Sequence, residues 1–161
     1  MGDMMTAEDR LAALGVSLPS PAAPVANYLP FVMSGSLLFI SGQLAFGADA
    51  TLDPAHTGKL GAAVSDSAGK AAARLCVINI LAQAKAALGG LDRISRCVRL
   101  GGFINAAPGF TNLAGVMNGA SDFIVDVLGD KGRHARCTVG VAELPLDCAV
   151  EIEALFEIAA A

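Results

Sequence analysis

The sequence predicts an α+β domain built on a single mixed β-sheet, with two helices packed on one face of that sheet. Three observations support this prediction. Segments with period-two and helical apolar spacing follow one another in the order hairpin, helix, strand, helix, hairpin. Connections of the strand–helix–strand type are almost always right-handed, which places both helices on the same face. A chain of 161 residues is long enough for one domain with a sizeable core.

The N-terminal part, residues 1–21, is predicted to form a helix on the outside of the domain and a proline-rich extension, and the domain itself is predicted over residues 22–161. The run Thr6–Asp9 is typical of a capped helix start, and Gly15 can end this short helix. Residues 17–30 contain four prolines, so we expect them to run extended across the surface.

The central part of the chain alternates between strand and helix patterns. Residues 31–34 and 37–41 are predicted to form a hairpin around a Ser-Gly-Ser turn. Apolar residues recur at helical spacing over residues 66–88, and two glycines then end the pattern. Residues 95–105 return to strand alternation, and a second helix is predicted over residues 111–128. These elements supply the strand–helix–strand units of the predicted fold.

The end of the chain is predicted to form two strands joined by a tight turn at Leu144–Asp147. Each strand alternates apolar residues with polar or small ones, which is typical of a strand with one buried face. In the hairpin register that this turn implies, the apolar side chains, that of Cys137 included, share the core face. Arg136 then lies on the other face together with Glu151 and Glu153, in a place suited to hold a ligand.

Composition narrows the class of function. Apolar residues make up 54% of the chain, but no uninterrupted apolar run reaches the length of about 18 residues that a membrane span needs. The polar start lacks the pattern of a signal peptide, so we expect a cytoplasmic protein without a membrane partner. A formal charge of −4 without a basic cluster argues against a nucleic-acid partner. The four cysteines lack paired spacing and are expected to be reduced thiols, and with only His56 and His134 no metal site is expected.

Three motifs near the C-terminus carry a family resemblance: Ala135-Arg136, the Val-Ala-Glu-Leu-Pro run at 141–145, and Val-Glu-Ile-Glu at 150–153. Together with Tyr28 and the Ile-Ser-Gly-Gln run at 40–43, they resemble the RidA/YjgF reactive-intermediate deaminases, often labelled endoribonuclease L-PSP. The resemblance covers residues 22 to 158, and the long N-terminus indicates a divergent branch. It implies a chorismate-mutase-like fold and a homotrimer whose sheets face inward as a barrel, with sites between subunits.

The resemblance also implies the roles of individual residues. In the family, an arginine at the position of Arg136 binds the substrate carboxylate, as its planar fork can do bidentately. A carboxylate at the position of Glu151 holds the attacking water, and a tyrosine at the position of Tyr28 covers the ligand. The remaining substrate-binding residues that the resemblance implies are Ser41, Gly42, Asn118 and Thr138. Thr138 stands where archetypal members have a cysteine, which leaves the identity of the substrate open.

Other interpretations of these residues stay open at this point. Arg136 could be a surface arginine, Tyr28 a packed aromatic residue and Asn118 a satisfied polar residue inside a helix, while Glu153 is assigned to solvent. In the predicted hairpin, Glu151 and Arg136 are separated by about 13 Å along the strands. One small substrate molecule does not reach both, so either the register differs or the site is shared between subunits.

The expected function is therefore hydrolysis of small reactive 2-imino or enamine acids to 2-keto acids and ammonia. The substrate is a small carboxylate, and no cofactor or metal is expected, because the imine is already reactive and positioning supplies much of the acceleration. A trimeric protein that binds small carboxylate metabolites without turnover is the alternative. The ribonuclease activity suggested by the family label ranks third, because the acidic charge and the sparse basic residues argue against it.

Overall fold

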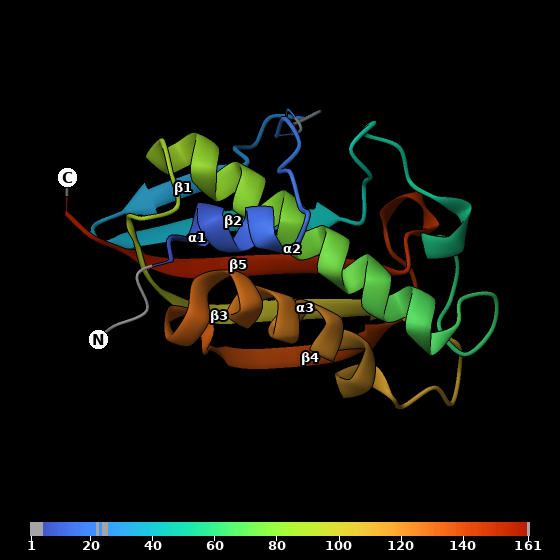
Figure 1. The fold of residues 1–161 in the computed structure, drawn as a ribbon. Coiled ribbons are helices and arrows are strands. Elements are labelled where there is room, and N and C mark those ends of the chain that lie inside the picture. The colour runs from blue at the N-terminus through green and yellow to red at the C-terminus, as the bar shows by residue number, and fades with distance from the viewer. Residues whose placement is uncertain (1–4, 22, 24–25, 161) are drawn as a thin grey trace.

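The computed structural model describes residues 5–21, 23 and 26–160, and it contains the predicted α+β domain with a single mixed sheet. The predicted boundary at residue 22 and the last residue of the domain, 161, lie outside the described residues. The described helices are α1 (Ala7–Ala13), α2 (Asp66–Leu88) and α3 (Leu113–Leu128). The strands are β1 (Phe31–Ser34), β2 (Leu37–Leu44), β3 (Ile94–Asn105), β4 (Ala135–Val141) and β5 (Val150–Ile158). The sheet has the strand order β1-β2-β5-β3-β4 (Figure 1).

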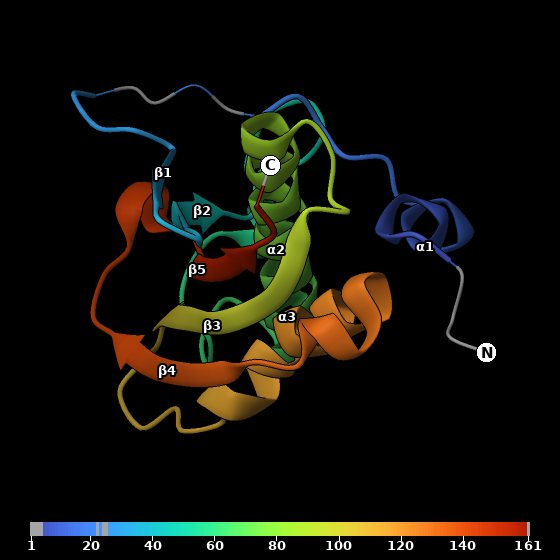
Figure 2. The same cartoon turned by 90° about the vertical axis from the view of Figure 1, so that its left-hand side faces the viewer.

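The α-helices of the described residues all lie on one side of the sheet, and none of them covers the other face (Figures 1 and 2). Helix α2 packs on β2 and β5, α3 packs on β3 and β4, and α1 packs on the outside of α3. Alternate residues of β5, from Val150 to Ile158, are buried against the helices. The core therefore lies between the sheet and the pair α2–α3, as the sequence predicts.

Helix α2 is the central element of this core. Its predicted limits are confirmed, because the Ser65 side chain caps its first turn and Gly89, with φ 78°, ends it in a left-handed conformation. Among the described helices, α2 alone is long and apolar enough to cross a membrane. However, 61% of its most apolar stretch is buried inside the domain, so its hydrophobicity is explained by packing.

The outer helix predicted from the first residues is also confirmed. The Thr6 hydroxyl accepts a hydrogen bond from the Asp9 backbone N–H, and the Asp9 carboxylate accepts one in return from the Thr6 backbone N–H. This reciprocal pair is a capping box, and it fixes the start of a helix that is too short to be stable alone. Leu11 is buried and joins α1 to the main core.

The predicted C-terminal hairpin is wrong, because β3 lies between β4 and β5. Strand β4 pairs in parallel with β3, with Arg136 beside Leu100, and β5 pairs antiparallel with the other edge of β3, with Ala154 beside Leu100. Alternation within a strand shows that successive side chains point to opposite faces of the sheet, but it specifies neither the neighbouring strand nor the face that is buried. Residues 142–149 can span about 27 Å, whereas passing one strand requires about 10 Å, so the connection crosses β3 easily.

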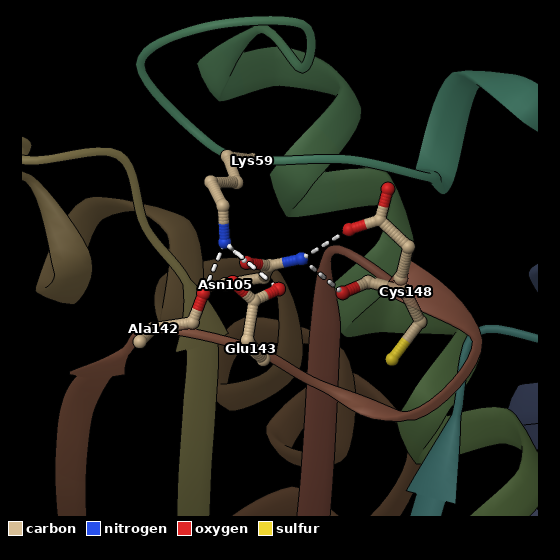
Figure 3. A network of polar contacts seen from close by, with 6 residues as sticks. Lys59, Asn105, Ala142, Glu143 and Cys148 are labelled. Carbon is tan, nitrogen blue, oxygen red and sulfur yellow. Dashed lines mark hydrogen bonds and ion pairs between the residues drawn. The ribbon is translucent and has the colours of Figure 1, made fainter.

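A buried asparagine at the end of β3 anchors this crossing connection (Figure 3). The Asn105 side-chain amide donates to Asp147 Oδ1 at 3.0 Å and to the Cys148 carbonyl at 3.1 Å. Lys59 Nζ donates to Asn105 Oδ1 at 2.7 Å and to the Ala142 carbonyl. Asn105 is completely buried, so losing these partners would leave polar groups unsatisfied. The network ties the loop before α2 to the β4–β5 connection.

Candidate functional site

Glu151 lies on the helix-free face of β5, directly over Gly42 of β2. A Cβ atom added to Gly42 would lie only 2.1 Å from Glu151 Oε1, so the position admits glycine alone while the carboxylate stays in place. The pairing of β2 with β5 shifts by one residue between Ile40 and Gln43, and this bulge contains Ser41 and Gly42. The predicted site residues Gly42 and Glu151 are therefore in direct contact.

Ser41 connects this part of the site to the segment that carries Tyr28. The Ser41 hydroxyl donates to the Leu29 carbonyl at 2.7 Å, and its backbone N–H donates to the Pro30 carbonyl at 3.0 Å. These two bonds hold the approach to β1 against β2, next to the half-exposed Tyr28 ring. Ser41 thus positions the segment, and its hydroxyl proton is already used within the protein.

A cavity of about 340 Å³ opens beside Glu151 at the edge of the sheet. Strand β1 pairs with β2 only as far as Ile40, so from Ser41 onward β2 is an edge strand and the space next to it is free. The walls are mainly apolar, and their residues include Tyr28, Pro30, Leu44, Phe46, Leu146 and Glu151. Three residues of the predicted site, Tyr28, Gly42 and Glu151, therefore line one cavity.

The environment of Glu151 changes its acidity. Burial raises the pKa of the Glu151 carboxyl above its ordinary value, and the negative charge of Glu153 raises it further. Glu153 itself, predicted to face solvent alone, accepts a hydrogen bond from Arg99 Nη1 at 2.9 Å in a half-exposed ion pair. A carboxylate with a raised pKa is a better proton acceptor, which is the property that a general base requires.

Arg136 lies elsewhere, on the side of β4 that faces α3. Its Nη1 donates to Asn118 Oδ1 at 2.9 Å and to Ser121 Oγ at 3.1 Å. The structure therefore brings the predicted residues Arg136 and Asn118 together. Both Nη1 hydrogens are used, and in the described part of the chain the Nε and Nη2 groups have no partner of their own. This exposed edge of the guanidinium can bind a carboxylate through two parallel hydrogen bonds.

Ser121 and His134 complete this cluster, and sequence analysis missed both. His134 Nδ1 lies 2.6 Å from the Gly132 carbonyl, which can only accept, so Nδ1 carries a proton. In the neutral ring Nε2 is then an acceptor, and the Ser121 hydroxyl donates a hydrogen bond to it at 2.9 Å. The Ser121 oxygen in turn accepts from Arg136. Ser121 lies one helical turn beyond Asn118, and that spacing was the available signal.

The neighbours of Arg136 on β4 correct the predicted faces. Thr138 faces α3, and its hydroxyl is buried and without a hydrogen-bond partner among the described residues, so it can still donate to another group. Cys137 was predicted to face the core, but it is exposed on the helix-free face. The other cysteines are buried and unpaired, and burial raises the pKa of Cys97 and Cys148 to about 12, so these thiols stay protonated.

The two parts of the predicted site do not meet within one chain. Glu151 is level with Phe103 of β3 and Val139 of β4, three residues beyond Arg136. This offset and the two intervening strand spacings give a separation of about 14 Å in the plane of the sheet, on opposite faces. Residues 5–21, 23 and 26–160 contain no group of three or more His, Cys, Asp or Glu side chains suited to a metal ion.

Comparison with known proteins identifies relatives over almost the whole chain. Residues 8–158 match the family described as "YjgF/chorismate_mutase-like, putative endoribonuclease". Protein TCP17 of Trypanosoma cruzi is 47% identical over 96% of this chain and 98% of its own length.

Two solved structures are similar to this chain over most of its length. The Agrobacterium tumefaciens protein Atu1372, of unknown function, is 46% identical, with a TM-score of 0.86 over 95% of this chain and 92% of its own. RidA from the Antarctic bacterium Psychrobacter sp. PAMC 21119 is 28% identical, with a TM-score of 0.60 over 86% of this chain and 94% of its own. The difference between these scores agrees with the divergent branch that the sequence indicates.

Proposed function

Because this chain belongs to the YjgF/chorismate-mutase-like family, we propose that it hydrolyses reactive 2-imino acids to 2-keto acids and ammonia without a cofactor. The observation that supports this most strongly is Glu151. It is a partly buried carboxylate with a raised pKa, at the wall of an apolar cavity, over a glycine that leaves its oxygens accessible. This is the environment in which a carboxylate can take a proton from water.

The reaction proceeds in two steps. Glu151 accepts a proton from water as the water oxygen bonds to the imine carbon, and the electron pair of the C=N bond moves to nitrogen, which takes up a proton from solvent. The resulting carbinolamine then loses ammonia: the proton held by Glu151 passes to the departing nitrogen, and the hydroxyl proton is released to solvent as the C=O bond forms. The balance is one imino acid and one water giving one keto acid and one ammonia, with Glu151 unchanged. Holding water next to an already reactive imine supplies much of the acceleration.

Arg136 binds the substrate carboxylate in this proposal, and it does so from a second subunit. Within one chain the guanidinium is too far from Glu151, whereas in a ring of subunits the β4 edge of one chain meets the β2 edge of the next. The helix-free face of the sheet supports such an assembly, because Val32, Phe39 and Val139 are large apolar side chains exposed on it. The assembly we propose is a homotrimer with its sheets facing inward.

The family description also contains the word endoribonuclease, and we assign that activity a lower rank. A polyanionic substrate requires clustered cations, whereas this chain has a formal charge of −4. On the exposed sheet face, Arg99 is already neutralised by Glu153. A carboxylate-binding protein without turnover remains the competing proposal, and the outcome of the following experiment separates the two.

The test measures imine loss above the spontaneous rate, with imines generated by an amino-acid oxidase. Glu151→Gln keeps the size of the side chain but removes the base, so the enzymatic rate should fall by about 10²–10⁴-fold. Glu153→Gln is the matched control, with the same chemical change two residues along β5, and it should keep most of the rate. Wild type without acceleration on any imine would favour the binding protein, and an active Glu151→Gln variant would remove Glu151 from the mechanism.

Two further measurements test the shared site. Light scattering at micromolar concentration should give the mass of three chains, and a monomer that is fully active would contradict the assembly. Arg136→Lys keeps the charge but loses the planar fork, so calorimetric titration with a 2-keto acid should show binding weakened by about 1.5–3 kcal/mol. Unchanged affinity would show that Arg136 does not contact the carboxylate.

A further inference from the structure

We infer that the cavity beside Glu151 binds an apolar substrate side chain, so that imino acids with branched or aromatic hydrocarbon side chains are preferred, and that Leu146 sets this preference. This inference rests on the proposed function and adds the substrate class to it. Three observations carry it: the chemistry of the cavity walls, the size of the cavity, and the backbone conformation of Leu146.

The walls of the cavity offer little to a polar side chain. Pro30, Leu44, Phe46 and Leu146 contribute hydrocarbon surface, and Glu151 is the charged group among the described lining residues. Gln43 and Gln83 also line the cavity; Gln43 Nε2 donates to the Ser41 carbonyl at 3.0 Å, and Gln83 is buried, with 2% of its surface exposed. A substrate carboxylate in this space would face Glu151 without a cation, and a side-chain hydroxyl would lose water against mainly apolar walls. An apolar side chain has no such cost.

The size of the cavity agrees with one small molecule. Ligand sites in proteins range from about 300 to 1,000 Å³, so a volume of about 340 Å³ lies at the small end of that range. A substrate with a one-carbon side chain would leave most of the apolar wall in contact with water. A leucine-like or phenylalanine-like side chain would cover Phe46 and Leu146 while the imine carbon stays near Glu151. Covering this surface favours the larger substrates.

Leu146 has a conformation that stability alone does not explain. Its backbone is left-handed, with φ 57° and ψ 21°, a region that glycine and asparagine adopt far more readily than leucine. Its side chain is 68% exposed, so it contributes little to the core. An unfavourable residue is thus held at the cavity wall by a loop that Asn105 anchors through Asp147. Strained residues of this kind concentrate at ligand sites.

The variant Leu146→Gly separates a binding role from a structural one. Glycine fits the left-handed backbone, so the melting temperature should stay the same or rise, whereas the loss of a packing side chain would lower it. We expect kcat/KM for the leucine and phenylalanine imines to fall by about tenfold, in line with the loss of hydrocarbon contact in a specificity pocket. The value for the alanine imine should stay close to that of wild type. Leu14→Ala is the control, at an exposed leucine that follows α1 and does not line the cavity. It should leave kcat/KM unchanged for all three imines.

The outcomes distinguish this inference from the proposed function. If wild type hydrolyses the alanine and leucine imines with equal kcat/KM, or if Leu146→Gly lowers both values equally, the inference is overturned while the function stands. If wild type hydrolyses no imine, the function fails, and calorimetric titration with pyruvate and with the 2-keto acid of leucine then decides. Tighter binding of the larger acid that disappears in Leu146→Gly supports the inference, and equal binding of the two acids refutes it.

Discussion

The contact between Gly42 and Glu151 allows the proposed base to be displaced without removing it. In Gly42→Ala the new Cβ would lie 2.1 Å from Glu151 Oε1, 3.0 Å from Cδ and 3.2 Å from Cγ. Ordinary contact begins near 3.4 Å, so the carboxylate oxygen must move by about 1.3 Å. A misplacement of about 1 Å in a reacting group can cost roughly 10²-fold in rate. We therefore expect turnover of the preferred imine to fall by about two orders of magnitude.

The fold should tolerate this change. Gly42 is exposed, and the atom that gives way is the end of a flexible side chain, so the melting temperature should change little. Gly101→Ala on β3, the other neighbour of β5, is the matched control, because its Cβ would lie 2.7 Å from Glu153 Oε1 and would displace that carboxylate instead. This variant should lose stability, because Gly101 is buried, but keep its turnover. Equal activity of Gly42→Ala and wild type, or equal losses in both variants, would refute a positioned Glu151.

Three further predictions concern the supports of the site. Ser121→Ala removes a hydrogen-bond acceptor of Arg136 and should weaken 2-keto acid binding by about 1 kcal/mol in calorimetric titration. Ser121→Thr keeps the hydroxyl and should restore the affinity, and equal affinity of wild type and both variants would contradict the role of Ser121. Asn105→Ala leaves Lys59 and the crossing connection without their partner, so urea unfolding should show a loss of about 2–3 kcal/mol, and a loss below about 0.5 kcal/mol would contradict the anchor. The pKa of Glu151 is raised in the folded state, so its carboxyl binds a proton more tightly there than in the unfolded chain. Its contribution to the free energy of unfolding is therefore full below the ordinary glutamate pKa and is lost as pH rises through the raised pKa. The melting temperature of Glu151→Gln relative to wild type should therefore increase from about pH 4 to about pH 7, and a constant difference would contradict the shift.

Local signals explain why the helices could be predicted so closely from the sequence. The limits of α2 follow from the helical apolar spacing, the serine cap at Ser65 and the left-handed stop at Gly89, all of which act within one turn of the helix. The hairpin of β1 and β2 is local in the same sense, because Gly35, with φ 59°, closes the turn between them. In these elements the residues that specify the structure are neighbours in the sequence.

Strand neighbours, in contrast, are decided by contacts between distant segments. The alternation in β4 is compatible with pairing to β5 or to β3, and the period of two is identical in both arrangements. Pairing with β3 reverses the predicted faces, so that Arg136 faces α3 and Cys137 is exposed. The same limitation hid Ser121 and His134, whose contact joins a helix to the segment that enters β4. The sequence therefore indicated which residues belong to the candidate site, but it did not indicate the faces on which they lie or the residues that they contact.

The insertion of β3 between β4 and β5 has a consequence for mixed assemblies. Each chain carries two half-sites, one that contains Glu151 and one that contains Arg136, and they lie apart in the sheet. In the proposed ring every complete site combines the Glu151 half-site of one chain with the Arg136 half-site of its neighbour. A chain that lacks Arg136 still offers an intact Glu151, and a chain that lacks Glu151 still offers an intact Arg136. When two such defective chains assemble at random in equal amounts, about a quarter of the interfaces bring two intact halves together. Two variants that are inactive on their own would therefore regain activity when they assemble together, because each supplies the half-site that the other lacks.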